Sequence, residues 1–107
     1  MLEQGAVFMS REGMKKMAKD KRLTDDPHAL LIYLVTNLEH LNWFSPDFTV
    51  LAKQLKITPL EVARHLKLLG ELGYISKKGE YDKVNLYRMS PEIAWLGTME
   101  ELEEEFS

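Results

Sequence analysis

The chain is 107 residues long, which is the size of one small domain, and we expect residues 1–107 to form a single domain. Its composition, 45% hydrophobic and 29% charged, is that of a globular protein and excludes disordered and collagen-like chains. No apolar run approaches the roughly 18 residues of a membrane-spanning helix. We therefore expect no role in a membrane.

The residue types also restrict the chemistry and the compartment. The sequence has no cysteine, which excludes disulfides, thiolate metal sites, iron–sulfur clusters and thiol nucleophiles. Residues 1–9 carry Glu3 and no basic residue, so they do not resemble a signal peptide. Together these features predict a cytoplasmic protein.

The charge is unevenly distributed along the chain. The formal net charge is −3, from 14 basic and 17 acidic residues, but five of the acidic residues are glutamates within positions 100–105. Without these five the net charge is 14 − 12 = +2, and the stretches 11–22 and 53–90 each carry a net charge of +4. The body of the molecule can therefore present a positive face to a nucleic acid, while residues 98–107 form an acidic terminal segment.

The first part of the chain predicts a short strand or a loose arm, followed by a helix. The strand or arm covers residues 5–9, and Ser10 can cap a helix that ends near Asp20. Gly13 weakens this helix by about 1 kcal/mol relative to alanine. One face of the helix would be apolar: Met14, Met17 and Ala18.

The second helix has the clearest pattern and is expected over residues 25–40. Thr24 is its candidate N-cap, aspartates follow at the positive helix start, and Pro27 lies in the first turn. The apolar residues follow the i, i+3, i+4, i+7 spacing of a helix that packs in the core: Leu31, Leu34, Val35, Leu38 and Leu41.

A short extended piece over residues 42–44 precedes the third helix. Ser45-Pro46 predicts the start of this helix, which would end near Leu55. Lys56-Ile57 forms a connection as short as those between paired helices. The inward face of the third helix would be Phe48, Leu51 and Ala52.

The segment Thr58-Pro59-Leu60-Glu61 carries the strongest local signal in the chain. Threonine at the N-cap, proline at the first helical position and glutamate at the third form a capping box. The helix is expected to run to about Leu72, before Gly73, which can adopt the left-handed conformation of a helix terminus. Its buried stripe would be Val62, Leu66 and Leu69.

After Gly73 the hydrophobic period changes from 3.6 toward 2. This change predicts strands over residues 74–78 and 84–89, joined by a polar loop of residues 79–83. Ser90-Pro91-Glu92 predicts a short helix, and Thr98 with Glu101 predicts a capping box for a terminal helix. The apolar residues of these last two helices would be Ile93, Ala94 and Trp95, then Met99, Leu102 and Phe106.

The order of these elements is that of a winged helix-turn-helix. We therefore expect a mainly α (α+β) fold with a two-stranded β-hairpin wing, and duplex DNA as the partner. The helix that Thr58 caps would enter the major groove, where the Arg64 guanidinium suits guanine and Lys67 would meet phosphate. The candidate DNA-binding residues on this helix and in the hairpin are Pro59, Leu60, Arg64, Lys67, Lys77, Lys78 and Lys83.

Other interpretations of these residues are structural. Lys67 can belong to a solvated helix face, and Lys77 with Lys78 can protect an exposed strand edge. Winged helices also act as protein-interaction modules, for which the acidic terminal segment and the methionines near the first helix would be available.

The sequence contains no motif of an enzyme, so we expect no catalytic residue, metal or cofactor. His28, His40 and His65 are far apart, with no H-E-x-x-H pattern and no carboxylate at ligand spacing. No glycine-rich nucleotide-binding loop is present.

Two segments resemble known families. Residues 48–75 resemble the helix-turn-helix of MarR-like winged domains. The ending Tyr87-Arg-Met-Ser-Pro-Glu-Ile-Ala-Trp-Leu-Gly97 is similar to the close of RepL-type plasmid replication proteins, as is the Ala-Leu-Leu-Ile-Tyr-Leu of the second helix. The likeness covers about residues 6–97, although Ser90 stands where the RepL type usually has asparagine.

The resemblance implies origin binding in plasmid or phage replication, without endonuclease activity, and a protein of the replication machinery as a further partner. It adds Thr58 to the DNA-binding residues named above. A MarR-like transcriptional regulator is the alternative. Because one recognition helix reads only a few base pairs, we also expect a homodimer, built on the first helix, the terminal helix or both.

Overall fold

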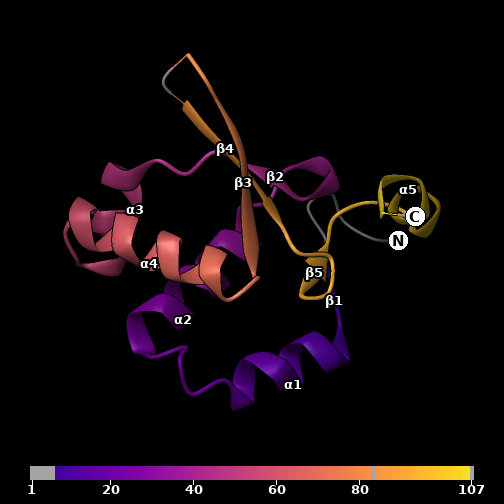
Figure 1. The fold of residues 1–107 in the computed structure, drawn as a ribbon, viewed down its shortest axis with the longest axis horizontal. Coiled ribbons are helices and arrows are strands. Elements are labelled where there is room, and N and C mark those ends of the chain that lie inside the picture. Colours follow the sequence, from indigo (N-terminus) through magenta and orange to yellow (C-terminus); the bar gives the residue numbers. More distant parts are fainter. Residues whose placement is uncertain (1–6, 83, 107) are drawn as a thin grey trace.

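The computed structural model describes residues 7–82 and 84–106, which form an α+β fold of five α-helices and two small antiparallel sheets (Figure 1). The helices are α1 (Arg11–Lys19), α2 (Asp25–Thr36), α3 (Phe48–Leu55), α4 (Pro59–Glu71) and α5 (Met99–Phe106), with a 3₁₀ turn at His40–Asn42. The strands are β1 (Phe8–Met9), β2 (Trp43–Phe44), β3 (Ile75–Tyr81), β4 (Val84–Met89) and β5 (Ala94–Trp95). Within the described ranges no helix is both long and apolar enough to traverse a bilayer.

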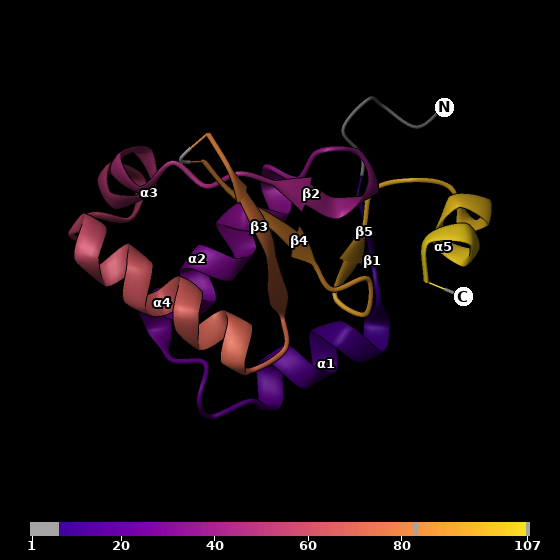
Figure 2. The ribbon, with the colours of Figure 1, turned by 45° about the horizontal axis from the view of Figure 1, so that its top comes forward.

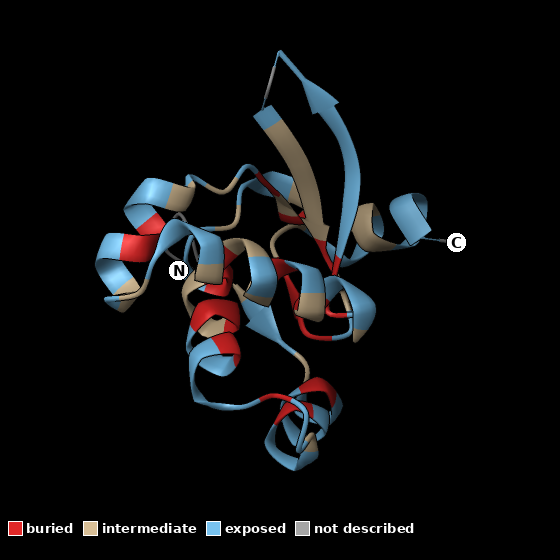
Figure 3. Cartoon of the chain, turned by 60° about the vertical axis from the view of Figure 1, so that its left-hand side comes forward, coloured by how far each residue is buried: buried red, intermediate tan, exposed pale blue. Residues whose placement is uncertain are grey.

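The core lies where α2 and α4 pack together and meet the base of the β3–β4 hairpin. The predicted stripe of α4 is fully buried, and the outer part of the hairpin extends into solvent (Figure 3). Figures 1 and 2 show α3 and α4 at one end of the molecule and α5 at the other. The largest buried side chains of the three elements are Leu30, Leu31, Leu66, Leu69 and Ile75.

Helix α1 begins as predicted, with the Ser10 hydroxyl accepting a hydrogen bond from the Gly13 N–H at 3.0 Å. Its apolar face differs from the prediction, because only Met17 is buried and both Met14 and Ala18 are exposed. The buried face instead passes through Gly13, which lies against the backbone of Glu92.

Helix α2 starts at Asp25 as predicted, but it ends at Thr36 and not at residue 40. The helix ends where the Thr36 hydroxyl and the Asn37 side-chain amide both donate to the Tyr33 oxygen, at 2.7 and 2.9 Å, and Asn37 leaves the helical conformation with φ of −117° and ψ of 18°. Thr24 occupies the N-cap position without a side-chain hydrogen bond. Of the predicted stripe, three residues are buried and two are half-buried: Leu31, Leu34 and Val35, then Leu38 and Leu41.

Helix α3 is capped by Asp47 and not by Ser45. The Asp47 carboxylate accepts hydrogen bonds from the N–H groups of Thr49 and Val50, at 3.0 and 3.1 Å. A carboxylate is the stronger cap because it also meets the positive end of the helix dipole. Two residues of the predicted inward face, Leu51 and Ala52, are buried, and Phe48 is half-buried against the core.

Helix α4 has the predicted capping box. The Thr58 hydroxyl accepts from the Glu61 N–H at 3.1 Å, and the Glu61 carboxylate accepts from the Thr58 N–H at 3.2 Å. Lys56, with φ of 58°, ends α3 and turns the chain toward α4. Gly73, with φ of 85°, follows the end of α4. The short connection and the box therefore fix the direction in which α4 leaves α3.

The larger sheet has the strand order β2-β4-β3. Strand β4 has the predicted bounds, but β3 is longer than predicted, because it continues through Gly79 to Tyr81, and the pairing Tyr81↔Val84 leaves only two residues between the strands. A register shift between Lys77 and Gly79 marks a bulge, which lets the strand continue through a glycine. The prediction of a five-residue loop is therefore wrong.

The segment after Ser90 is a turn over residues 91–93 followed by the two-residue strand β5, and not a helix. Ala94 pairs with Met9 and Trp95 with Phe8, so β5 and β1 form a second small sheet. Local sequence favours a helix here, but the partner strand, more than 80 residues earlier, supplies hydrogen bonds that a short helix could not replace.

Helix α5 begins with the second predicted capping box, in which Thr98 and Glu101 exchange hydrogen bonds of 2.9 and 3.0 Å. Its described residues include none that is fully buried. The Arg88 guanidinium lies between the rings of Trp43 and Phe106, 4.6 Å from each centroid, so this stacking attaches α5 to the sheet.

Candidate nucleic-acid interface

Helix α4 presents a polar and basic face to solvent. Val62, Leu66 and Leu69 are buried against α2 and α3, and this orientation turns Arg64 and Lys67 outward. Leu60 is 61% exposed, an unusual position for a large apolar side chain. The structure thus brings the predicted residues of α4 together on one accessible surface.

Thr58 is exposed, but its hydroxyl is already engaged. It accepts from the Glu61 N–H and donates to the Glu61 carboxylate, at 3.1 Å in both cases. Its hydroxyl therefore fixes the first turn of α4, and a phosphate would have to displace the Glu61 carboxylate to accept the hydroxyl hydrogen.

Helix α3 adds two basic residues that the sequence analysis did not select. Lys53 in its last turn and Lys56 at its end are both exposed. Their signal was present in the sequence as the basic stretch 53–90, but only the packing of α3 on α4 shows that the two helices lie at the same end of the molecule (Figure 2).

The hairpin separates the two lysines that the sequence grouped together. Lys77 pairs with Tyr87, whose ring stacks on the buried Phe44, with centroids 5.5 Å apart. Lys78 lies on the other face, in a hollow that Arg88 and Phe106 also line. Lys77 therefore shares the face of the sheet that meets the core helices, and Lys78 faces α5, while Lys83 lies outside the described residues.

The basic residues of α3 and α4 have no acidic partner in residues 7–82 and 84–106. The ion pairs of this part involve Lys15–Glu12, Arg22–Asp20, His40–Glu101 and Arg88–Glu105. Arg22 and Arg88 are thus neutralised within the molecule, whereas the charge of Arg64 is directed to solvent.

A cluster of possible ligands lies beside this surface, at the start of α4. One ligand atom from each of Asp26, Glu61 and His65 lies within 4.8 Å of the other two. The sequence prediction that no carboxylate stands at ligand spacing from a histidine is therefore wrong for His65, since Glu61 precedes it by four residues on the same helix face.

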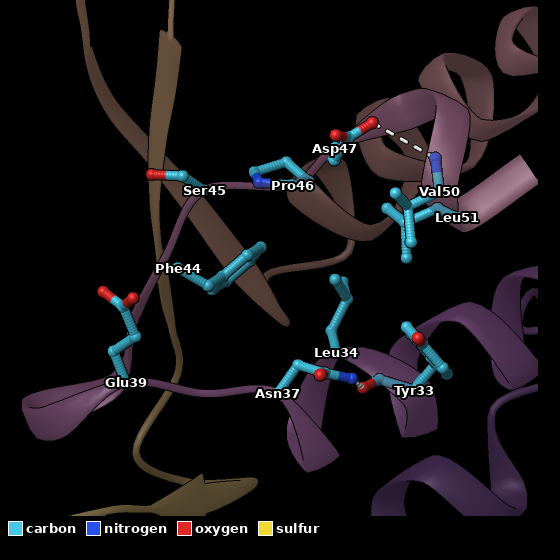
Figure 4. Close-up of a pocket in the computed structure, with 10 residues that line it drawn as sticks. All are labelled: Tyr33, Leu34, Asn37, Glu39, Phe44, Ser45, Pro46, Asp47, Val50 and Leu51. Atoms are coloured by element: carbon cyan, nitrogen blue, oxygen red, sulfur yellow. Dashed lines mark hydrogen bonds between the residues drawn. The ribbon is translucent and has the colours of Figure 1, made fainter.

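A cavity of about 220 Å³ lies between the end of α2 and the start of α3 (Figure 4). Phe44 and Tyr33 border it, and the Asp47 carboxylate at its rim is occupied in capping α3. This volume is below the roughly 300–1,000 Å³ of most small-molecule sites.

No protein-family model, curated protein or solved structure matches this chain.

Proposed function

We propose that this protein is a winged helix-turn-helix that binds duplex DNA through α4 and the β3–β4 hairpin. The observation that carries the proposal is that the basic residues of two helices joined by a tight turn are all exposed and form no ion pair with a described residue: Lys53, Lys56, Arg64 and Lys67. The hairpin that follows α4 directly supports the same interpretation, because a wing occupies this position in such domains.

The dimensions of α4 suit the major groove. Its 13 residues make a helix about 20 Å long, and a single helix fits the groove of B-DNA. Arg64 would donate two hydrogen bonds to guanine, while Lys53, Lys56 and Lys67 would meet phosphates. In the hairpin we assign phosphate contact to Lys77 alone, because Lys78 faces α5.

The biological role that we propose is origin binding in the replication or copy control of a plasmid or phage. Its support is the resemblance of residues 87–97 to the RepL type. DNA binding by this surface requires no catalytic group, metal or cofactor, and a MarR-like regulator would use the same surface at an operator.

The test is the affinity for duplex DNA as a function of salt. Four lysines that meet phosphates should give a slope of log affinity against log salt of about −3.6, at roughly −0.9 per contact. Fluorescence anisotropy with a labelled duplex measures this slope. No binding at low salt, or a slope near zero, would refute the proposal.

Variants then separate reading of bases from contact with phosphate. Arg64→Ala should lose about 1–3 kcal/mol on a selected site and relax the preference at one base pair. Lys77→Ala should weaken all duplexes alike, whereas Lys78→Ala, the matched control on the opposite face, should change little. Equal losses of DNA affinity in Lys77→Ala and Lys78→Ala would refute the assignment of phosphate contact to Lys77 alone.

A further inference from the structure

The cluster at the start of α4 combines two carboxylates and one imidazole, side chains that often bind a metal ion together. Asp26 lies in the first turn of α2, and Glu61 and His65 lie one turn apart on α4. Figure 2 shows α2 packed alongside α4, so a ligand held by these residues would join the two helices.

One ring nitrogen of His65 has no hydrogen-bond partner in the described part of the chain. This atom, Nε2, is also shielded from solvent. Neither carboxylate forms an ion pair with this imidazole in the described part of the chain. A buried polar atom without a partner is costly, so a ligand that engaged this nitrogen would remove that cost.

Both carboxylates retain an oxygen for a ligand. Glu61 uses Oε1 for the capping box, where the Thr58 N–H and hydroxyl donate to it. The described residues offer no hydrogen bond to Glu61 Oε2 or to the exposed Asp26 carboxylate. Glu61 can therefore cap the helix and bind an ion at the same time.

We propose that Asp26, Glu61 and His65 bind a divalent first-row transition ion, represented by Zn²⁺. An imidazole with two carboxylates favours such an ion over Ca²⁺ or Mg²⁺, which prefer oxygen ligands alone. Zinc bonds of about 2.0–2.2 Å place tetrahedral ligand atoms roughly 3.4 Å apart. Ligand atoms that lie within 4.8 Å of one another reach this spacing by small side-chain rotations, for which the exposed Asp26 is free.

The ion would regulate the DNA-binding surface, a consequence that rests on the proposed function. Two carboxylates at the start of α4 repel the phosphates that Arg64 and Lys67 attract. A bound Zn²⁺ neutralises both charges and fixes α4 to α2. DNA affinity should therefore rise with Zn²⁺.

Isothermal titration of the full chain with Zn²⁺ tests the site itself. We expect one site, with an affinity that falls at least about tenfold in Asp26→Asn, Glu61→Gln or His65→Gln, since even residues outside the ligand sphere contribute this much. Asp25→Asn, an adjacent carboxylate outside the cluster, is the matched control and should keep the affinity within about threefold. No Zn²⁺ binding, or binding that all four variants retain, would overturn the proposal and would assign any uptake to the acidic terminal helix.

Duplex titrations with and without Zn²⁺ test the regulatory step. We expect Zn²⁺ to tighten DNA binding at least about threefold, because repulsion is removed. Asp26→Asn should bind DNA more tightly than the unaltered chain without Zn²⁺ and should respond only at Zn²⁺ concentrations at least about tenfold higher. Zn²⁺ binding by a chain that binds no DNA would refute the proposed function and leave the metal site standing, while DNA binding that ignores a bound Zn²⁺ would refute the regulation.

Discussion

Gly13 lies inside α1, where alanine would ordinarily be the better helix former by about 1 kcal/mol. A Cβ atom built on this residue would lie 2.1 Å from the backbone oxygen of Glu92, and a backbone atom cannot turn aside as a side chain can. The clash outweighs the propensity, since overpacking a close contact costs about 1–3 kcal/mol. We expect Gly13→Ala to lower the free energy of unfolding by about 1–2 kcal/mol.

Gly70 provides the matched control for this prediction. It also lies inside a helix, but the nearest atom to its Cβ position is the Ile75 oxygen at 3.9 Å, an ordinary contact. Gly70→Ala should therefore raise stability by about 0.5–1 kcal/mol, as the lost flexibility of glycine predicts. Urea denaturation of both variants measures the pair, and a stabilised Gly13→Ala would contradict the close approach of α1 to Glu92.

Asp20 shows how one carboxylate couples stability to pH. Hydrogen bonds from the Arg22 side chain, and then from the Tyr74 hydroxyl at 2.8 Å, hold the pKa of Asp20 well below its usual 3.8. Burial raises the pKa of the Tyr74 hydroxyl to about 12, and the hydrogen bond to Asp20 is the second cause of this increase. Because the folded-state pKa of Asp20 is depressed, its contribution is present above about pH 4 and is lost as the pH falls below that value.

This dependence is testable with Asp20→Asn. The variant should be less stable than the unaltered chain near pH 7, and the difference should shrink toward about pH 2.5, where the carboxylate of the unaltered chain becomes protonated in the unfolded state. Urea midpoints at the two pH values measure it, with the exposed Asp82→Asn as the control. A stability difference that is the same at both pH values would show that Asp20 does not contribute to the loss of stability in acid.

At the scale of elements, the sequence predicted what is decided locally. The box at Thr58 and the cap at Ser10 were correct because a few adjacent residues satisfy the first N–H groups of each helix. The strand at residues 94–95 was missed because its partner lies at the other end of the chain. Asn42 was missed for the same reason: it is fully buried and donates to the Met89 and Ala94 oxygens, at 3.0 and 2.7 Å.

Helix α5 is attached to the domain without being part of its core. No described residue of α5 belongs to the buried cluster, so a chain that ends at Gly97 should still fold. Trp95 would lose the edge contact with Phe106 and the acceptor of its indole N–H, the Thr98 oxygen at 2.9 Å. We expect the tryptophan emission to shift to longer wavelength, because the indole becomes more exposed to water.

Fluorescence and circular dichroism of the shortened chain measure this prediction together. Glu104→Gln in the full chain is the control, since this glutamate is exposed and should leave the emission unchanged. Loss of a cooperative unfolding transition on truncation would instead make α5 an obligatory part of the fold.

At the scale of the molecule, the sequence located the basic surface but not its details. The stretch 53–90 indicated positive charge, and the periodicity of α4 oriented Arg64 and Lys67 correctly. Alternation along a strand places Lys77 and Lys78 on opposite faces, but only the pairing with Tyr87 shows that Lys77 lies on the face that meets the core. The cluster of Asp26, Glu61 and His65 could not be predicted, because Asp26 comes beside the other two only when α2 packs on α4.

The ends of the chain carry the apolar surface from which a homodimer is expected. Phe8, Met9 and Met14 are 46%, 41% and 40% exposed, and β1 has one hydrogen-bonding edge that β5 does not use. This surface lies with β5 and α5, away from α3 and α4, so pairing through it leaves the basic surface of each copy accessible (Figure 1). We expect two copies to associate through β1 and α1 and to bind half-sites separated by about one DNA turn or a multiple of it, roughly 34–36 Å each.

Sedimentation at micromolar concentration, with and without a two-site duplex, measures the association. Phe8→Ser should shift the equilibrium toward the monomer, because an apolar side chain at the centre of a small interface supplies much of its energy. Val50→Ser is the matched control, since Val50 is equally exposed, at 46%, but lies on α3. A full-length chain that stays monomeric both free and on DNA would refute the dimer, and equal effects of the two serine variants would place the interface elsewhere.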